Sequence, residues 1–143
     1  MHAARFAVYG IAFIHKNNHV LLIKRSDTNS FCPGHYSLVG GLLEKHETFR
    51  QAIARELNEE IGITVNPADL HFVHMFHRIG TENEIVVGVF ECTTWQGEMF
   101  NKEPQKHSDL AWFDINHLPD IMVPAHRNAL ELIKQKKLYS EQP

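Results

Sequence analysis

Residues 41–63, GLLEKHETFRQAIARELNEEIGI, constrain the fold more than any other stretch of this chain. Apolar residues recur there every four positions: Phe49, Ile53, Leu57 and Ile61. This period predicts a helix that packs one apolar stripe against a core. Thr48, followed three residues later by Gln51, predicts a capping box at the start of the helix. Gly62 can adopt the left-handed conformation that ends a helix.

Three carboxylates, Glu56, Glu59 and Glu60, close the same stretch, and their spacing places them on one face of the helix. Glu59 and Glu60 fall in the last turn, where the helix dipole favours cations, at a cost of roughly 0.3–1 kcal/mol each. A divalent cation would reverse this penalty by using the carboxylate oxygens as ligands. An all-oxygen site suits Mg²⁺, with Mn²⁺ as the alternative, better than Zn²⁺. From the spacing alone, a solvated acidic helix face is an equally good interpretation.

The stretch resembles the Nudix (MutT-like) box, G-x5-E-x7-R-E-U-x-E-E-x-G-U with U aliphatic. It matches at every defined position: Gly41, Glu47, Arg55, Glu56, Leu57, Glu59, Glu60, Gly62 and Ile63. The resemblance implies a loop–helix–loop that binds Mg²⁺ and pyrophosphate, with Glu56, Glu59 and Glu60 as metal ligands. It also implies that Arg55 orients a catalytic carboxylate and that Glu47 helps to hold the loop. A surface ion pair is the alternative interpretation of Arg55.

Outside the box, the resemblance implies a further metal ligand or general base on a loop nearer the C-terminus. Glu103 is the leading candidate, with His107 and Asp109 as rivals. A solvated loop acid is an equally good interpretation of Glu103. In similar bacterial Nudix proteins, the position of His107 is commonly Cys.

The sequence also predicts substrate-binding residues upstream of the helix. Gly40 and Gly41 permit close approach of a ligand to the backbone; many Nudix proteins have Pro where this chain has Val39. Arg25 follows a predicted strand and is a candidate phosphate contact. Tyr36 is a candidate for stacking on a base, although aromatic residues are more often part of the core.

The rest of the chain predicts a mixed sheet between helices. Strands are expected over residues 5–14, 20–23, 36–39, 70–76, 84–91 and 110–113, with a second helix over 124–137. The first two strands form a hairpin, a tight turn is expected at 80–83, and a long loop at 93–108. The result is an α/β fold, an α/β/α sandwich, which is also the arrangement of the Nudix fold.

Length and composition fit one domain over residues 1–143. The net charge of −3 argues against a general nucleic-acid-binding surface. Two cysteines without a CxxC pair fit a reducing compartment, and no apolar run reaches the roughly 18 residues of a membrane span. We therefore expect a cytoplasmic protein without a nucleic-acid or membrane partner. Homodimers are frequent in the family, so self-association is also expected.

The resemblance implies an enzyme that cleaves a nucleoside diphosphate linked to another group. A nucleoside triphosphate, hydrolysed to monophosphate and pyrophosphate, is the leading substrate. Residues 77–79 lack the Pro or Tyr that ADP-ribose and dinucleoside polyphosphate subgroups carry in this window, which favours the triphosphate. Cleavage of ADP-ribose or a nucleotide sugar is the alternative. A non-catalytic nucleotide-binding module is a second alternative, but such domains usually lose box acids and this chain keeps them all.

Overall fold

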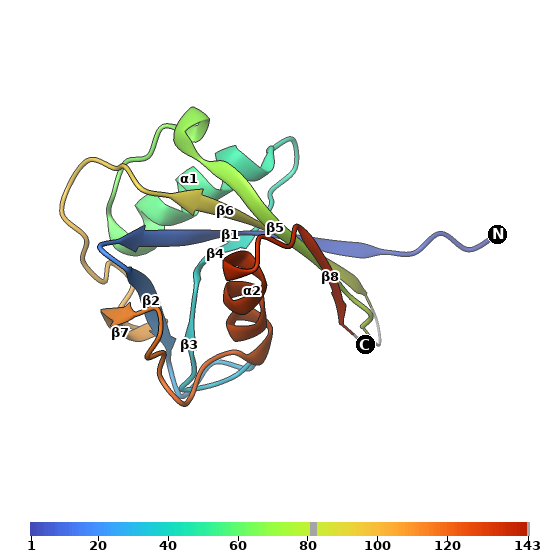
Figure 1. Ribbon diagram of the computed structural model, residues 1–143. Coiled ribbons are helices and arrows are strands. Elements are labelled where there is room, and N and C mark those ends of the chain that lie inside the picture. The colour runs from blue at the N-terminus through green and yellow to red at the C-terminus, as the bar shows by residue number, and fades with distance from the viewer. Residues whose placement is uncertain (81–82, 143) are drawn as a thin grey trace.

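The computed structural model describes residues 1–80 and 83–142 (Figure 1). The strands are β1 Phe6–Lys16, β2 His19–Arg25, β3 Tyr36–Ser37, β4 Val39–Leu42, β5 His71–Arg78, β6 Glu84–Cys92, β7 His107–Asp114 and β8 Tyr139–Gln142. The helices are α1 Phe49–Ile61, the short 3₁₀ helix η1 Pro67–Asp69 and α2 Pro124–Lys134. The main path of the sheet runs β3-β2-β1-β6-β5-β8, while β4 pairs with β1 and β7 pairs with β2. The parallel pair β1–β6 makes the sheet mixed, as expected.

Strand β1 organises the two layers, because its residues alternate between the faces of the sheet. Ala12 and Ile14 pack in one apolar cluster with α1 residues such as Leu57. Ile11 and Phe13 pack in a second cluster with α2 residues such as Leu130. The two helices therefore cover opposite faces, and the α/β/α prediction is confirmed (Figure 1).

Helix α1 begins and ends where the sequence predicts. The Thr48 side chain accepts from the Gln51 N–H, the Gln51 side chain accepts from the Thr48 N–H, and Gly62 adopts φ 74°. The predicted stripe faces the core, with Ile53, Leu57 and Ile61 fully buried. The helix axis and the direction of its acidic face are thus fixed by local signals and one apolar stripe.

The predicted hairpin of the first two strands is confirmed. Strands β1 and β2 pair antiparallel, and the connecting residues Asn17 and Asn18 both adopt positive φ, 51° and 63°. Asparagine tolerates this conformation better than most residues, and it suits the twist of a tight hairpin. Of the expected turn at 80–83, residues 81 and 82 lie outside the described residues.

Several boundaries differ from the sequence prediction. The strand expected at 36–39 is two short strands, and β4 continues through both glycines to Leu42. Strand β7 begins at His107, so the preceding loop is shorter than expected. The edge strand β8 was not predicted, because its polar sequence carries no alternation. It is held by parallel pairing with β5 and by a contact of the His74 Nε2 with the Ser140 hydroxyl at 2.9 Å.

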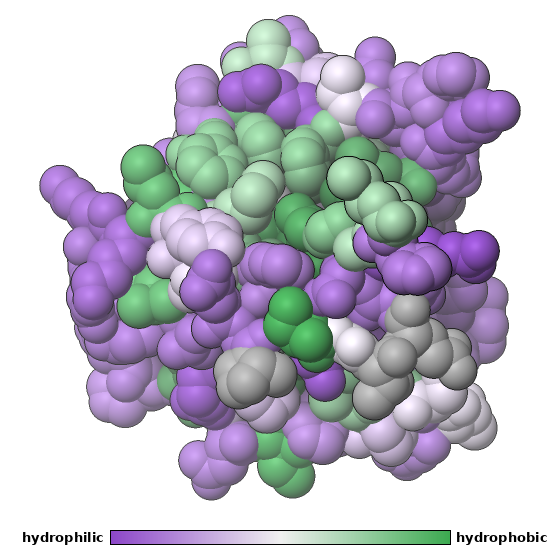
Figure 2. All heavy atoms as spheres, turned by 90° about the vertical axis from the view of Figure 1, so that its right-hand side faces the viewer, coloured by the Kyte–Doolittle hydropathy of each residue, from purple (hydrophilic) through white to green (hydrophobic). Residues whose placement is uncertain are grey.

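The surface mixes polar and apolar regions. On the face drawn in Figure 2, apolar residues gather in the upper half of the view, with polar residues above and below them. Large hydrophobic side chains exposed on the molecule include Phe6, Leu42, Ile79 and Tyr139. Within the described residues, no helix has the length and apolar character needed to cross a membrane. Self-association remains a prediction.

Candidate active site

The two glycines of β4 let the acidic face of α1 approach the sheet closely. Gly40 and Gly41 pair with Ile11 and Gly10 of β1. A Cβ added at Gly41 would lie 2.6 Å from the Glu56 Oε1, and one at Gly40 would collide with the Gly10 carbonyl oxygen. Any other residue would push the strand and the carboxylate apart. Within the fold, the glycines thus make room for the Glu56 carboxylate and for β1, and the expected approach of a ligand to this backbone stays a prediction.

Arg55 is the centre of an ion-pair network rather than one partner of a surface pair. Its guanidinium donates two hydrogen bonds to Glu47, at 2.8 and 2.9 Å, and others to Glu56 at 3.0 Å and Glu59 at 3.2 Å. It also donates to the Leu42 carbonyl oxygen at 3.2 Å. The hydrogen bonds from Arg55 hold the pKa of Glu47 at about 2, so this carboxylate stays ionised. The network ties the loop before α1 to two of the three box acids.

Glu60 differs from the other two acids because, among the described residues, no Lys or Arg forms an ion pair with it. It is only 8% exposed, and its Oε2 is buried without a hydrogen-bond partner among the described residues. Burial raises its pKa to about 8, and the neighbouring charges of Glu56 and Glu103 add to the rise. Burial likewise raises the pKa of Glu56, against the opposing effect of Arg55. The site thus crowds carboxyl groups whose ionised forms are disfavoured, and a bound cation would favour the ionised forms.

The acids do not already surround one point. Among residues 1–80 and 83–142, no group of three or more His, Cys, Asp or Glu side chains stands ready to hold a metal ion. Arg55 holds Glu56 and Glu59, so these carboxylates must shift to share an ion with Glu60. The donor set still fits Mg²⁺ or Mn²⁺, because it offers carboxylate oxygens and includes the unpartnered, buried Oε2 of Glu60.

The loop before β7 packs on the C-terminal end of α1 and brings Glu103 to the acids. The Phe100 N–H donates to the Ile61 carbonyl oxygen at 3.1 Å, and the Lys102 N–H donates to that of Glu60 at 3.0 Å. These bonds give hydrogen-bond partners to carbonyl groups that have no partner within the helix at its C-terminal end. Glu103 itself is half-buried and forms an ion pair with Lys106 at 3.0 Å. The structure therefore places the leading candidate from outside the box beside Glu60.

The two rivals of Glu103 have different surroundings. His107 is buried, and its Nε2 lies 3.8 Å from the Glu60 Oε1. Asp109 lies farther along β7, where its Oδ2 accepts a 2.6 Å hydrogen bond from the Tyr36 hydroxyl. Glu103 and His107 thus adjoin the box acids, and Asp109 is engaged elsewhere.

The packing of Tyr36 supports the alternative interpretation of this residue as part of the core, and its contact with substrate stays a prediction. The Tyr36 ring packs edge-on against Phe113, and its hydroxyl bond to Asp109 raises the pKa of Tyr36 to about 12. Tyr36 does not line the cavity described next. Strand β2 pairs with both β3 and β7, which brings Tyr36 of β3 close to residues of β7. The ring and hydroxyl of Tyr36 are therefore both engaged within the sheet.

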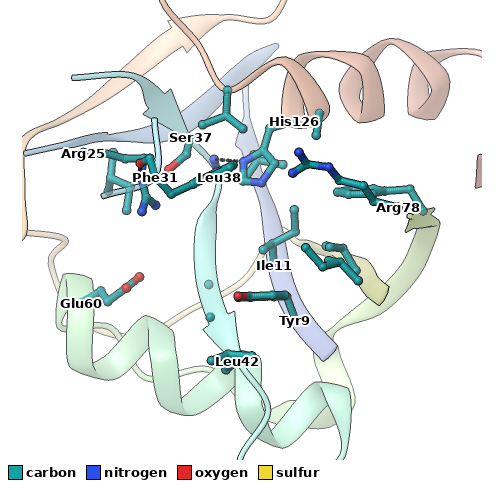
Figure 3. A pocket seen from close by; sticks show the side chains of 18 of the residues that line it. Tyr9, Ile11, Arg25, Phe31, Ser37, Leu38, Leu42, Glu60, Arg78 and His126 are labelled. Atoms are coloured by element: carbon teal, nitrogen blue, oxygen red, sulfur yellow. Dashed lines mark hydrogen bonds between the residues drawn. The ribbon is translucent and has the colours of Figure 1, made fainter. Parts of the chain in front are cut away.

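A cavity of about 490 Å³ opens beside Glu60 (Figure 3). Its apolar wall comes from strands of the sheet, and the residues are Tyr9, Ile11, Phe76, Ile85 and Val87. Both glycines of β4 and Arg25 also line it, and their contact with substrate stays a prediction. The Arg25 guanidinium is held by the Phe31 carbonyl oxygen at 2.7 Å and the Asn29 Oδ1 at 2.6 Å. It is thus fixed at the cavity rather than free in solvent.

Sequence reasoning missed His126, which lines the cavity from α2 (Figure 3). Its Nδ1 accepts a hydrogen bond from the Leu38 N–H at 3.1 Å, which assigns the proton of the neutral ring to Nε2. Burial lowers the pKa of His126 to about 4, and the charge of Arg25 lowers it further. The ring is therefore a neutral donor of fixed tautomer. No motif marks this histidine, because its role depends on a contact between residues far apart in the sequence.

Known proteins resemble this chain over most of its length. A NUDIX domain model matches residues 4–133. An ADP-ribose pyrophosphatase of Methanocaldococcus jannaschii is 34% identical over 80% of this chain and 64% of its own length. An 8-oxo-dGTP diphosphatase of Proteus vulgaris is 36% identical over 62% of this chain and 76% of its own length. The chain thus spans less than two thirds of the first of these relatives.

Solved structures share the fold. The crystal structure of a MutT NUDIX hydrolase from Burkholderia pseudomallei has a TM-score of 0.81 and 29% identity, over 89% of this chain and 97% of the other. The overall fold of this chain, a mixed sheet with two helices, thus matches that of a MutT NUDIX hydrolase.

Proposed function

This chain belongs to the Nudix family, and from that premise we propose that it hydrolyses a pyrophosphate linkage in a nucleoside diphosphate compound. The leading substrate is a nucleoside triphosphate, released as monophosphate and pyrophosphate. One observation carries the proposal: Glu60, whose buried Oε2 has no partner among the described residues, belongs to a complete Nudix box and lines a cavity of about 490 Å³. Charge for the phosphates and space for the nucleoside are therefore adjacent.

Glu56, Glu59 and Glu60 would hold Mg²⁺, with Mn²⁺ as the alternative ion. When bound, such an ion neutralises phosphate oxygens and lowers the pKa of a coordinated water. Arg55 acts as a positioning residue, because it contacts both Glu56 and Glu59 while Glu47 fixes its own orientation. Arg25 supplies a second positive charge at the cavity.

Glu103 is the proposed general base. Its carboxylate adjoins the box acids, and Lys106 pairs with its Oε2. A carboxylate in this place can accept a proton from the attacking water. The positively charged groups at the site would stabilise the negative charge that develops on the phosphate oxygens. The loop that packs on the end of α1 keeps Glu103 at the site. Phe100 and Lys102, which come shortly before Glu103 in this loop, donate hydrogen bonds to carbonyl groups of the helix.

The cavity supports a nucleoside as the group that is recognised. A flat base suits the apolar wall of β1, β5 and β6, and the His126 Nε2–H offers one fixed donor for an acceptor on the base or sugar. The names of the two relatives concern ADP-ribose and an oxidised nucleoside triphosphate. For this chain, cleavage of ADP-ribose or a nucleotide sugar remains the alternative. A module that binds a nucleotide without cleaving it is a second alternative, which the complete set of box acids disfavours.

A substrate panel tests the proposal directly. The protein is incubated in roughly 5 mM Mg²⁺ with nucleoside triphosphates, oxidised triphosphates, ADP-ribose, nucleotide sugars and dinucleoside polyphosphates, and the products are identified by mass. Turnover of one class is expected, lost in Glu59→Gln and kept in Glu98→Gln, an exposed acid outside the site. Turnover of ADP-ribose alone would select the alternative substrate. If no compound of the panel is hydrolysed but a nucleotide raises the melting temperature in the presence of Mg²⁺, the protein would instead be the binding module.

A further inference from the structure

His107 and Glu60 are two buried polar side chains that face each other without a hydrogen bond. His107 is 6% exposed and Glu60 is 8% exposed. The distance from the His107 Nε2 to the Glu60 Oε1 is 3.8 Å, which is too long for a hydrogen bond. Among the described residues, the His107 Nδ1 and the Glu60 Oε2 also have no partner. Because buried polar groups are almost always satisfied, the Glu60 carboxylate calls for a ligand: its Oε2 has no partner among the described residues, and its Oε1 faces an imidazole nitrogen beyond hydrogen-bond distance.

The spacing suits one metal ion. Two ligand atoms that each lie about 2.1 Å from an ion are at most about 4.2 Å apart, and about 3 Å apart when adjacent in an octahedron. The observed 3.8 Å falls inside this range, so a small shift of either side chain would allow both to bind. A negatively charged oxygen and an imidazole nitrogen form a mixed donor set, unlike the carboxylates alone.

The backbone of His107 is firmly placed for such a role. Its N–H donates to the Glu103 carbonyl oxygen at 3.0 Å, and its carbonyl oxygen accepts from the Asn101 Nδ2 at 2.6 Å. It is also the first residue of β7, whose pairing with Arg25 of β2 fixes the strand. The ring therefore points at Glu60 from a rigid element, as a ligand must.

We propose that His107, through Nε2, is a ligand of the divalent cation that Glu60 binds, and that it shifts the preference of the site from Mg²⁺ towards Mn²⁺. This rests on the proposed function only in assuming that Glu60 binds the ion. Mg²⁺ is a hard ion that takes oxygen ligands and keeps its waters, whereas imidazole nitrogen suits first-row transition metals. One nitrogen in place of a water thus favours Mn²⁺.

Pulsed electron paramagnetic resonance of the Mn²⁺-loaded protein tests the contact without relying on activity. A directly bound imidazole gives ¹⁴N modulation of the Mn²⁺ signal, and histidine labelled with ¹⁵N changes its frequency. The modulation is expected in the wild type and lost in His107→Asn and in His107→Gln. It is expected to persist in His126→Asn, a matched variant of the other histidine that lines the cavity.

Metal titration gives a second readout. Loss of the nitrogen ligand is expected to weaken Mn²⁺ binding about tenfold or more and to change Mg²⁺ binding much less, so the preference for Mn²⁺ falls. A wild-type protein that binds Mn²⁺ without ¹⁴N modulation would overturn the proposal, and the isotope comparison decides this even if the His107 variants fail to fold. Mn²⁺-dependent hydrolysis in that same protein would leave the proposed function standing.

Discussion

Replacing Glu60 with Gln should stabilise the metal-free protein, by an amount that grows as the pH rises from about 5 to about 8. Burial, aided by Glu56 and Glu103, raises the pKa of the Glu60 carboxyl from its ordinary 4.5 to about 8. Between these values the folded protein binds a proton that the unfolded chain has released. The contribution of Glu60 to stability is therefore complete below pH 4.5 and is lost as the pH rises to 8.

The expected magnitude follows from this interval. Each pH unit between the two pKa values costs about 1.4 kcal/mol of unfolding free energy. At pH 7 the wild type therefore loses about 3 kcal/mol that Gln, which never ionises, does not lose. Unfolding 143 residues carries an entropy of about 0.3 kcal/mol/K, so the melting temperature rises by about 10 °C. At pH 5 the same reasoning gives less than about 1 kcal/mol.

Calorimetric melting in a chelating buffer at pH 5, 6, 7 and 8 measures this effect. Glu98→Gln, an exposed acid, serves as the control and should give a small shift that does not depend on pH. With Mn²⁺ or Mg²⁺ present at about 100 times its Kd, the wild type should regain about 2.7 kcal/mol, and Glu60→Gln much less. A shift of the same size at every pH would refute the account of Glu60 as a buried, uncompensated acid.

Three further substitutions test other parts of the site. Arg55→Lys cannot make the paired bonds to Glu47, so kcat should fall at least about tenfold with little change in melting temperature; an unchanged kcat would remove Arg55 from its positioning role. Gly41→Ala places a Cβ against the Glu56 carboxylate and should weaken metal binding in a calorimetric titration; unchanged affinity would contradict it. Tyr36→Phe should cost about 1 kcal/mol of stability in denaturant unfolding and leave KM unchanged, whereas a raised KM would return Tyr36 to the substrate site.

The sequence predicted those parts of the fold that depend on neighbouring residues. The capping box at Thr48, the Gly62 terminus and the asparagine turn of the first hairpin all rest on contacts within a few positions. The apolar stripe of α1 belongs to the same class, because its period alone determines which face is buried. The family resemblance, not periodicity, supplied the role of the acids and of Glu103.

The parts that could not be predicted depend on contacts between distant residues. Tyr36 is withdrawn from the cavity by Asp109, 73 positions away, and His126 gains its tautomer from the backbone of Leu38, 88 positions away. Strand β8 pairs with the edge of β5, and its four residues, of which only Tyr139 is apolar, carry little strand signal of their own. None of these partners can be paired from one sequence, because the pairing is made by the sheet topology.

The distribution of charge explains why Glu60, among three similar acids, should decide both stability and binding. Arg55 neutralises Glu56 and Glu59 directly, while Glu60 faces His107 and the negative charge of Glu103. A cation that binds here therefore gains most from Glu60, and disturbs Arg55 only where it draws in Glu56. The network of Arg55 thus holds Glu56 and Glu59 without the metal, whereas the Glu60 Oε2 has no partner among the described residues. If the proposed function holds, the Oε2 atom that carries the energetic penalty belongs to the same Glu60 carboxylate that would bind the ion.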